Sequence, residues 1–309
     1  MHGRLRKLGG GRGRLVLAIA VLGAALGLGA PLGAPALDAA DRYVAGGAVV
    51  ERSPVAADRA DAVRAMARSF GARLGLPPAA ALRVERVTDR FAGATYDEVT
   101  GTDGLGQAIH LQRLDDRGRL VGAVVFGWQS NGGRALANAR AAANRGSRLA
   151  AQLELDTSGD PDVQAVPDGD GWTLGWQRFV DGVPVVGDGV RIDLWPDGRV
   201  HAVVRTERAL ATRPATILDA AAARGSAEAT LKNQFGDRAG EIAVSSVALG
   251  WVAPNGTFDP TAPDAPGATL RLAWVAEAQS SGDLADGLRA VKLFLDAGTG
   301  DLIGGDVLQ

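Results

Sequence analysis

Apolar positions alternate with polar or small ones in three segments of the range 171–205, and this is the most regular pattern in the chain. Strict alternation is typical of strands that bury one face. The positions expected to face inward are Trp172, Leu174, Trp176, Val190, Ile192, Leu194, Val200, Ala202 and Val204. Asp181-Gly182 and Pro196-Asp197-Gly198 separate the segments and favour tight turns. The pattern therefore predicts three consecutive antiparallel strands.

A helical pattern precedes this region. Apolar residues recur three or four positions apart at Val63, Met66, Ala67, Phe70 and Leu74. Such spacing predicts a helix with one buried stripe, and Ser53-Pro54 supplies an N-cap and a first helical residue. Strands are expected around 82–87, 109–111 and 120–126, followed by an Ala-rich helix over 134–155.

The pattern repeats after residue 205. Thr216 to Asp219 resembles a capping box, and it predicts a third helix over 217–234. Strands are expected over 242–252, 268–278, 288–295 and 301–308. The predicted fold class is α+β, with two tandem units in which a helix packs on an antiparallel sheet. The units are 53–158 and 159–309, and the polar stretch 156–171 separates them.

The N-terminal segment has the pattern of an export signal. Basic residues precede the apolar run Leu15 to Leu28, and Ala34-Pro35-Ala36 offers a small-residue cleavage site. Residues 1–36 are therefore predicted to be a signal peptide, and 37–52 a flexible leader. An uncleaved anchor is the alternative, and it is the one case in which we expect contact with a membrane. Both interpretations predict a secreted or extracytoplasmic protein.

Composition removes several classes of function. The chain has no cysteine, which excludes disulfides, thiolate metal sites, a cysteine nucleophile and a lipoprotein anchor. The formal charge of −2 becomes −7 when the five basic residues before Asp38 are removed with the signal peptide. An acidic chain argues against nucleic acid as a partner.

Two stretches resemble a known family. The sequence FVDGVPVVGDGVRIDLWPDGRV (179–200) is similar to the fungalysin/thermolysin propeptide motif, and LRLAWVAEA and VKLFLDAGTGDLIGGDVL (270–278 and 291–308) resemble the PepSY module. The resemblance covers about residues 165–309. It implies cystatin-like units, in which a helix packs on an antiparallel sheet. It also implies a role like that of propeptides, which inhibit secreted zinc metalloproteases and help them to fold.

The resemblance also suggests where a partner would bind. Family members place an arginine and a glutamine before the G-V-P-V turn, and Gln177 and Arg178 match them loosely. Phe179 follows directly, and Trp195 lies on the polar phase of its strand. We predict Arg178, Phe179 and Trp195 as partner-binding residues. The chain ends at Gln309, where a catalytic domain would begin in the protease precursors.

Catalytic patterns are missing from the sequence. A zinc metalloprotease of the zincin class needs the motif H-E-x-x-H, but His110 and His201 are isolated in segments predicted to be strands. The G-x-S-x-G motif of serine hydrolases is also missing. We expect no enzymatic activity, no cofactor and no metal site. A triad assembled from distant segments remains open, and it would bring His201 together with an acid and a serine.

Two loops could be mistaken for ligand sites. Acidic and polar residues between Asp156 and Asp170 offer oxygen ligands for calcium, but Pro161 and Pro167 stand where an EF-hand needs Gly and Glu. A solvated linker is the preferred interpretation, and calcium stays open. Gly298 to Gly300 lies between two strands, so no helix N-terminus follows to receive a phosphate.

Together these observations predict a non-catalytic, exported binding module that resembles metalloprotease propeptides. Its partner would be a secreted metallopeptidase, which it would inhibit or help to fold. The alternative is a structural PepSY-like module that binds a cell-envelope component and has no protease partner. Mutation of Trp195 should separate the two hypotheses.

Overall fold

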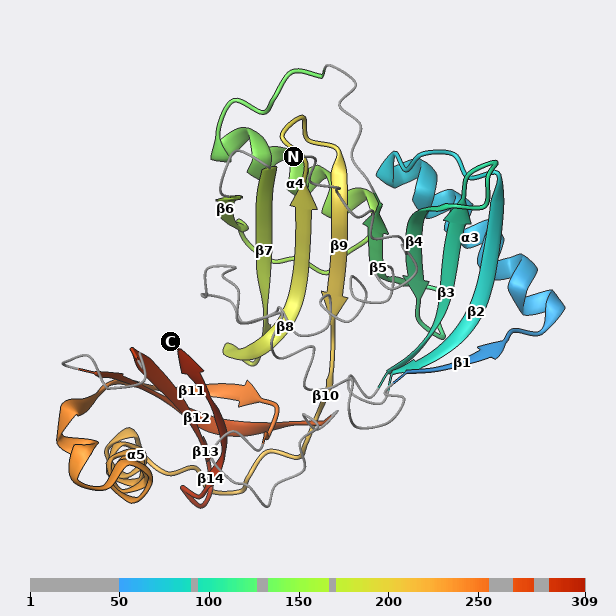
Figure 1. Ribbon diagram of the computed structural model, residues 1–309. Coiled ribbons are helices and arrows are strands. Elements are labelled where there is room, and N and C mark those ends of the chain that lie inside the picture. Colours follow the sequence, from blue (N-terminus) through green and yellow to red (C-terminus); the bar gives the residue numbers. More distant parts are fainter. Residues whose placement is uncertain are drawn as a thin grey trace, which may run out of the picture. The chain divides into compact units, whose positions relative to one another are not determined.

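The computed structural model describes residues 50–89, 94–126, 133–166, 171–255, 269–280 and 289–308 (Figure 1). The predicted signal peptide and nearly all of the predicted leader lie outside these residues. The α-helices are α3 (Ala57–Leu74), α4 (Ala139–Gln152) and α5 (Ala220–Phe235), and the 3-10 helix η2 (Gly236–Glu241) follows α5. None of the described helices is long and apolar enough to span a bilayer.

The strands fall into two runs along the chain. The first run is β1 (Val50–Pro54), β2 (Ala81–Asp89), β3 (Ala94–Thr102), β4 (Ala108–Leu114), β5 (Leu120–Val125), β6 (Asp162–Val166), β7 (Gly171–Val180), β8 (Val183–Leu194) and β9 (Val200–Thr206). The second is β10 (Ala209–Leu210), β11 (Ile242–Val252), β12 (Thr269–Ser280), β13 (Ala290–Asp296) and β14 (Leu302–Leu308).

The prediction of tandem cystatin-like units is wrong. The described strands form one mostly antiparallel sheet of 14 strands, ordered β1-β2-β3-β4-β5-β9-β8-β11-β12-β13-β14, with β6, β7 and β10 off this path. Strand β5 pairs with β9, so strands from the two sides of the predicted boundary are direct neighbours. Local alternation shows which face of a strand is buried, but it does not show which strand its free edge will meet.

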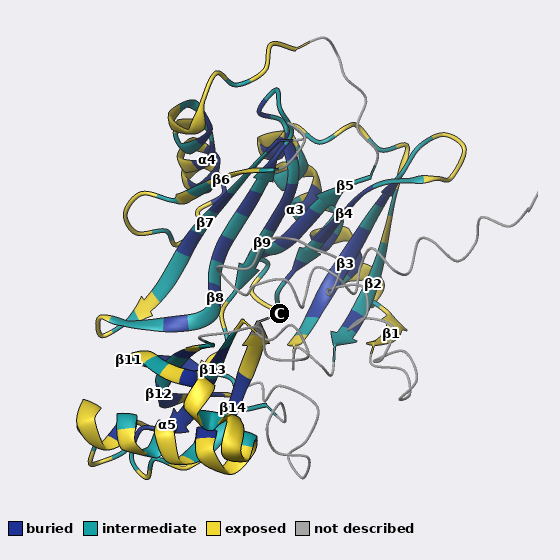
Figure 2. Cartoon of the chain, turned by 60° about the vertical axis from the view of Figure 1, so that its left-hand side comes forward, coloured by how far each residue is buried: buried dark blue, intermediate teal, exposed yellow. Residues whose placement is uncertain are grey.

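The first core lies between the β1–β9 part of the sheet and helices α3 and α4. Val63 and Ala67 of α3 and Leu149 of α4 are fully buried against residues such as Val99 and Ile192. Figure 2 shows buried segments along the central strands of this part of the sheet. Gly146 of α4 lies directly over Leu174, where a Cβ would come within 2.6 Å of its side chain. The glycine that weakens the helix therefore lets α4 approach the sheet closely.

The N-terminus of α3 differs from the sequence expectation. Ser53 and Pro54 belong to β1, where Ser53 pairs with Arg86, and the helix begins at Ala57 with Ala56 as N-cap. Pro54 lacks an N–H group and lies in a strand for which β2 is the only partner among the described residues, which suits an edge strand.

One β-bulge changes the inward phase of β9. Asp193 pairs with Ala202 and Leu194 with Val200, so His201 is the extra residue. Val200 and Val203 consequently belong to the first core. Ala202 is also buried, as expected, but is not part of that cluster, and Val204 is only half-buried. The bulge lies beside the turn that follows Leu194.

The second core lies between α5 and strands β11–β13. Ala223, Ala227 and Leu231 form the buried stripe of α5, and they pack against residues such as Leu272 and Leu293. Asp219 is the N-cap, and its side chain accepts a hydrogen bond from the N–H of Ala222 at 2.8 Å. The helix therefore begins three residues later than the capping box at Thr216 suggested.

Two short pairings connect the β1–β9 strands to the β11–β14 strands. Val185 of β8 forms a parallel bridge to Trp251 of β11. Ala209 and Leu210 form β10, which pairs in parallel with the start of β12. Both contacts involve chain close to the β7–β8 hairpin, and a buried charge lies there.

Candidate binding site at the β7–β8 hairpin

The β7–β8 hairpin contains irregular backbone at both strands. Asp181 and Gly182 connect the strands with positive φ values of 52° and 77°, as a type I′ turn requires. The pairing shifts between Gln177 and Phe179, where Arg178 of β7 lies opposite four residues of β8, 185–188, so the extra residues of this bulge belong to β8. A bulge redirects side chains away from the regular alternation. The directions of Gln177 and Arg178 therefore cannot be read from the period of the strand.

Glycine is required on the opposite strand. Gly189 has a φ of 143°, and a Cβ there would lie 2.0 Å from the carbonyl oxygen of Trp176. The neighbouring residue, Asp188, is the last of the extra residues of β8 and is buried. The G-D-G sequence thus lets an acidic residue enter the interior of the sheet.

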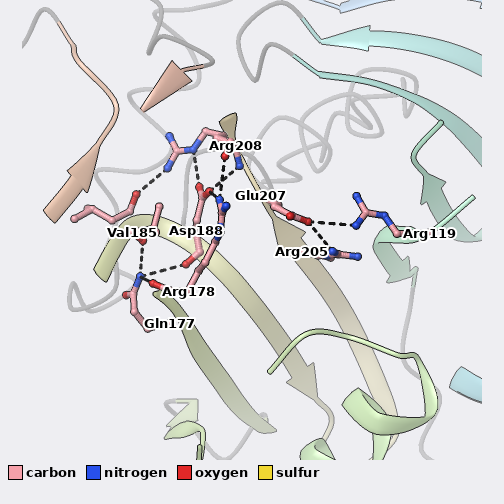
Figure 3. A network of polar contacts seen from close by, with 9 residues as sticks. Arg119, Gln177, Arg178, Val185, Asp188, Arg205, Glu207 and Arg208 are labelled. Carbon is pink, nitrogen blue, oxygen red and sulfur yellow. Dashed lines mark hydrogen bonds and ion pairs between the residues drawn. The ribbon is translucent and has the colours of Figure 1, made fainter. Parts of the chain in front are cut away.

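Asp188 is buried and is contacted by two arginines. Its Oδ2 accepts hydrogen bonds from Arg178 Nη1 at 3.0 Å and from the backbone N–H of Arg208 at 2.7 Å (Figure 3). Its Oδ1 accepts a hydrogen bond from Arg208 Nε at 2.6 Å. A buried carboxylate is tolerated when it is paired and hydrogen-bonded, and these three donors satisfy it.

Further hydrogen bonds connect these residues to the backbone. Arg178 Nη1 also donates to the carbonyl of Arg208 at 2.9 Å, and Arg208 Nη2 donates to that of Val186 at 2.8 Å. Gln177 Nε2 donates to the carbonyls of Val185 and Asp188. We call Gln177, Arg178, Asp188 and Arg208 the Asp188 cluster. It ties the irregular part of the hairpin to the chain between β9 and β10.

The Asp188 cluster carries more positive than negative charge. Two guanidinium groups share one carboxylate, and their side chains are 24% and 21% exposed. Arg178 uses only Nη1, so its Nε and Nη2 have no hydrogen-bond partner among the described residues. A second carboxylate from outside could therefore be accommodated beside the buried one.

Phe179 lies next to this charge. Its exposed fraction is 55%, and it pairs across the hairpin with Pro184. Two of the three predicted partner-binding residues, Arg178 and Phe179, are consecutive in β7. Their role in binding stays a prediction.

Trp195 lies elsewhere. It follows the last residue of β8, Leu194, which pairs with Trp172, seven residues before Phe179 in β7, so Trp195 lies roughly 25 Å from the tip of the hairpin. Its ring packs against His201 with centroids 4.2 Å apart, and it is half-buried. Trp195 is therefore a packed side chain and does not lie with the other two predicted residues.

Both histidines of the described strands lie in surroundings that favour the neutral imidazole. Burial lowers the pKa of both His110 and His201, which favours their neutral forms. His110 is only 4% exposed and its Nδ1 has no hydrogen-bond partner in the described part of the chain. Within the same described ranges, no three residues among His, Asp and Glu lie close enough together to hold a metal ion.

The two loops considered from sequence have structural roles where they are described. Asp296 Oδ1 accepts the N–H groups of Gly298 and Thr299 at 2.9 and 3.2 Å, so these amides are not available to a phosphate. Asp162 lies in β6 and accepts a hydrogen bond from Gln164. Asp168 and Asp170 lie outside the described residues, and calcium binding by this loop stays a prediction.

Asp188 and Arg208 were not singled out from the sequence. An Asp between two glycines in a strand is the one local signal, because glycine permits the close backbone approach that buries it. Nothing near Arg208 in the sequence indicates that it pairs with a residue twenty positions earlier. That pairing depends on the path of β9 alongside β8.

Comparisons with known proteins add one structural similarity. No family model matches the chain, and no curated protein matches it significantly. The chain is similar in structure to the Bacillus megaterium YpeB C-terminal domain, with a TM-score of 0.42 and 15% sequence identity, over 82% of this chain and 98% of that one. The function therefore has to be argued from the site itself.

Proposed function

We propose that the protein is a non-catalytic binding module that contacts its partner through the β7–β8 hairpin. The observation that carries this proposal is the position of exposed Phe179 beside an arginine pair with surplus positive charge. Aromatic residues and arginine are the side chains most enriched at energetic hot spots of protein interfaces. The hairpin thus offers an apolar anchor and a charged group in one place.

The Asp188 cluster makes the hairpin suitable for recognition because it holds the strands in one arrangement. Asp188 accepts three hydrogen bonds, and Gln177 bonds to both strands of the hairpin. A surface that is already ordered loses less conformational entropy on binding than a mobile loop does. The buried charge is therefore useful for positioning Phe179.

The chemistry of the hairpin indicates what the partner presents. An apolar pocket would receive the ring of Phe179, and a carboxylate would pair with the unused donors of Arg178. The resemblance of residues 179–200 to metalloprotease propeptides directs the search to a secreted metallopeptidase. We propose that the module slows such an enzyme or assists its folding.

The experiment uses the purified full chain and the secreted peptidase activity of the organism that produces it. The fraction of casein hydrolysis that EDTA abolishes is measured with increasing amounts of the protein. We expect dose-dependent inhibition of this fraction, and the Phe179→Ser and Arg178→Gln variants should weaken it at least tenfold.

Leu105 supplies a matched control. It is 86% exposed in the turn between β3 and β4, so Leu105→Ser removes an exposed apolar side chain away from the hairpin. We expect this variant to inhibit like the unmodified protein. Equal inhibition by the Phe179 and Leu105 variants, or no inhibition of any secreted metallopeptidase, would reject the proposal.

The cell-envelope alternative stays a prediction. Its test involves Trp195, whose ring is half-buried and packs against His201. The test remains retention of the protein on isolated cell walls, compared between the unmodified chain and Trp195→Ala.

A further inference from the structure

Helix α4 has an unusual charge pattern. Its fourteen residues include Arg140, Arg145 and Arg148 and no acidic residue. At about 100° per residue, these arginines span an arc of roughly 140° of the helix surface. The buried residues Ala142, Gly146, Leu149 and Ala150 lie on the opposite side. We call the three arginines the α4 arginine face.

These arginines have no carboxylate partner among the described residues. Arg140 and Arg148 are exposed, and Arg145 donates through Nε to the carbonyl of Gly198 at 3.0 Å. Burial, followed by the nearby positive charge of Arg148, lowers the pKa of Arg145. The face is thus a concentration of positive charge that the described part of the protein does not neutralise.

Abundant arginine alone does not produce this arrangement. Helix α3 also carries several arginines, but Arg59, Arg64 and Arg73 pair with Asp97, Asp61 and Glu154. Three of the four arginines of α3 are thus paired with carboxylates, whereas none of the three on α4 is paired with one among the described residues. The imbalance on α4 is therefore a local property.

We propose that the α4 arginine face binds a phosphate-bearing polyanion, separately from the partner of the β7–β8 hairpin. Guanidinium groups bind phosphate through two parallel hydrogen bonds, and arginine suits this geometry better than lysine does. Arg140 and Arg148 are about 12 Å apart along the helix axis, too far for one phosphate to bridge. A chain of linked phosphates can contact both.

The residues around the arginines favour a polymer over a folded protein or a membrane. The exposed large apolar residues in the described ranges are Val50, Leu105, Phe179 and Val307, and none of them lies on α4. A protein interface needs apolar anchors, and a helix that lies on a bilayer needs an apolar side to insert. The α4 face offers charge with small and polar neighbours only, which suits a hydrated polyanion.

Binding of the full chain to inorganic polyphosphate tests the proposal. We expect saturable binding that weakens with salt, because contacts to phosphates release counterions. The double variant Arg140→Gln/Arg148→Gln should bind at least tenfold more weakly in 50 mM salt. The slope of log K against log salt should fall by about 1.4, which corresponds to two lost phosphate contacts.

Control variants and competing ligands make the test decisive. Arg117→Gln/Arg213→Gln removes two exposed arginines away from α4 and should leave the affinity unchanged. Poly-glutamate and vesicles with anionic phospholipid should bind much more weakly than polyphosphate. The proposal would be overturned if both double variants lost the same amount of affinity for polyphosphate. It would also be overturned if poly-glutamate or the vesicles bound as tightly as polyphosphate. Peptidase inhibition should be unaffected by the α4 variants, so the two proposals can fail independently.

Discussion

Two regions of the sheet bury carboxylates between arginines, and they differ in how completely the charge is matched. In β3, Asp97 pairs with Arg59 and Arg86, and Glu98 pairs with Arg52 and Arg113. We call these six residues the β3 cluster. Further acids, Glu85 and Asp116, contact three of its four arginines. At the Asp188 cluster two arginines share a single acid.

The difference separates a structural role from a binding role. In the β3 cluster the arginines come from β1, α3, β2 and β4, so the ion pairs fix the helix and the neighbouring strands to β3. Each of its two carboxylates is shared by two arginines, and three of these arginines contact a further acid, so its charges are balanced within the protein. The Asp188 cluster fixes a hairpin and retains unused donors next to exposed Phe179. Similar chemistry thus serves folding in one place and can serve recognition in the other.

The largest expected effect is the removal of a buried acid. Asp188→Ala leaves two partly buried guanidinium groups without their counter-charge, and we expect the free energy of unfolding to fall by about 3–5 kcal/mol. Urea unfolding of the full chain measures it. Asp61→Ala is the control, because Asp61 is exposed in its pair with Arg64 and should cost under about 1 kcal/mol. A similar small loss for Asp188 would mean that the cluster does not hold the hairpin.

The second prediction compares one arginine from each cluster. Arg113→Gln should cost about 2–3 kcal/mol, because Glu98 keeps only Arg52 and the contact of Arg113 over the Tyr96 ring is lost. Arg178→Gln should cost about 1 kcal/mol, because Asp188 keeps its two hydrogen bonds to Arg208. If urea unfolding gave the same loss of stability for both variants, the proposed difference between the balanced β3 cluster and the Asp188 cluster would be wrong.

The third prediction concerns close packing in the region of the β3 cluster. A Cβ at Gly101 would lie 2.2 Å from Cε1 of the His110 ring, so Gly101→Ala should cost about 1–3 kcal/mol. In the double variant Gly101→Ala/His110→Ala the ring is absent, and the added methyl group should cost much less on that background. Thermal unfolding of the four proteins completes the cycle. Additive losses would show that the two residues do not interact.

The smallest expected effect is a dependence of stability on pH. Burial lowers the pKa of His110 below its ordinary value of 6.5, so the unfolded chain binds protons first as the pH falls. The free energy of unfolding should therefore decrease as the pH is lowered below about 6.5, and it should not change for this reason above that pH. Urea midpoints between pH 8 and 5 measure the trend. His110→Gln should have a shallower decrease, and parallel curves would contradict the assignment.

The sequence predicted many local elements correctly. Strands β7, β8 and β9 were expected from alternation, and the buried faces of β7 and β8 were assigned correctly because their side chains follow a period of two. Strand β3 was missed, since Asp97 and Glu98 interrupt its apolar pattern. These two acids are buried by arginines from elements as far away as β1, which local sequence cannot show. The same reason explains why Asp188 was overlooked.

The net charge of the chain also concealed a local feature. The acidic total argued against nucleic acid as a partner, yet α4 carries three arginines on the side opposite its buried residues and no acid in its own sequence. A total charge averages over a surface, whereas a ligand meets only one part of it. The helical period of α4 was visible in the sequence. Only the folded structure shows that no carboxylate of the described residues pairs with its arginines.

Sequence alone determined the periods of the strands and helices, the turns at Asp181-Gly182 and Pro196–Gly198, and the lack of cysteine chemistry. These follow from backbone preferences and side-chain type, which act over a few residues. Only the tertiary structure decided that β5 meets β9, that Arg208 reaches Asp188, and that Trp195 packs on His201. Those contacts depend on which strand edges pair and on which residues pair with the buried charges. The residues involved are far apart in the chain, so local sequence patterns do not predict the contacts.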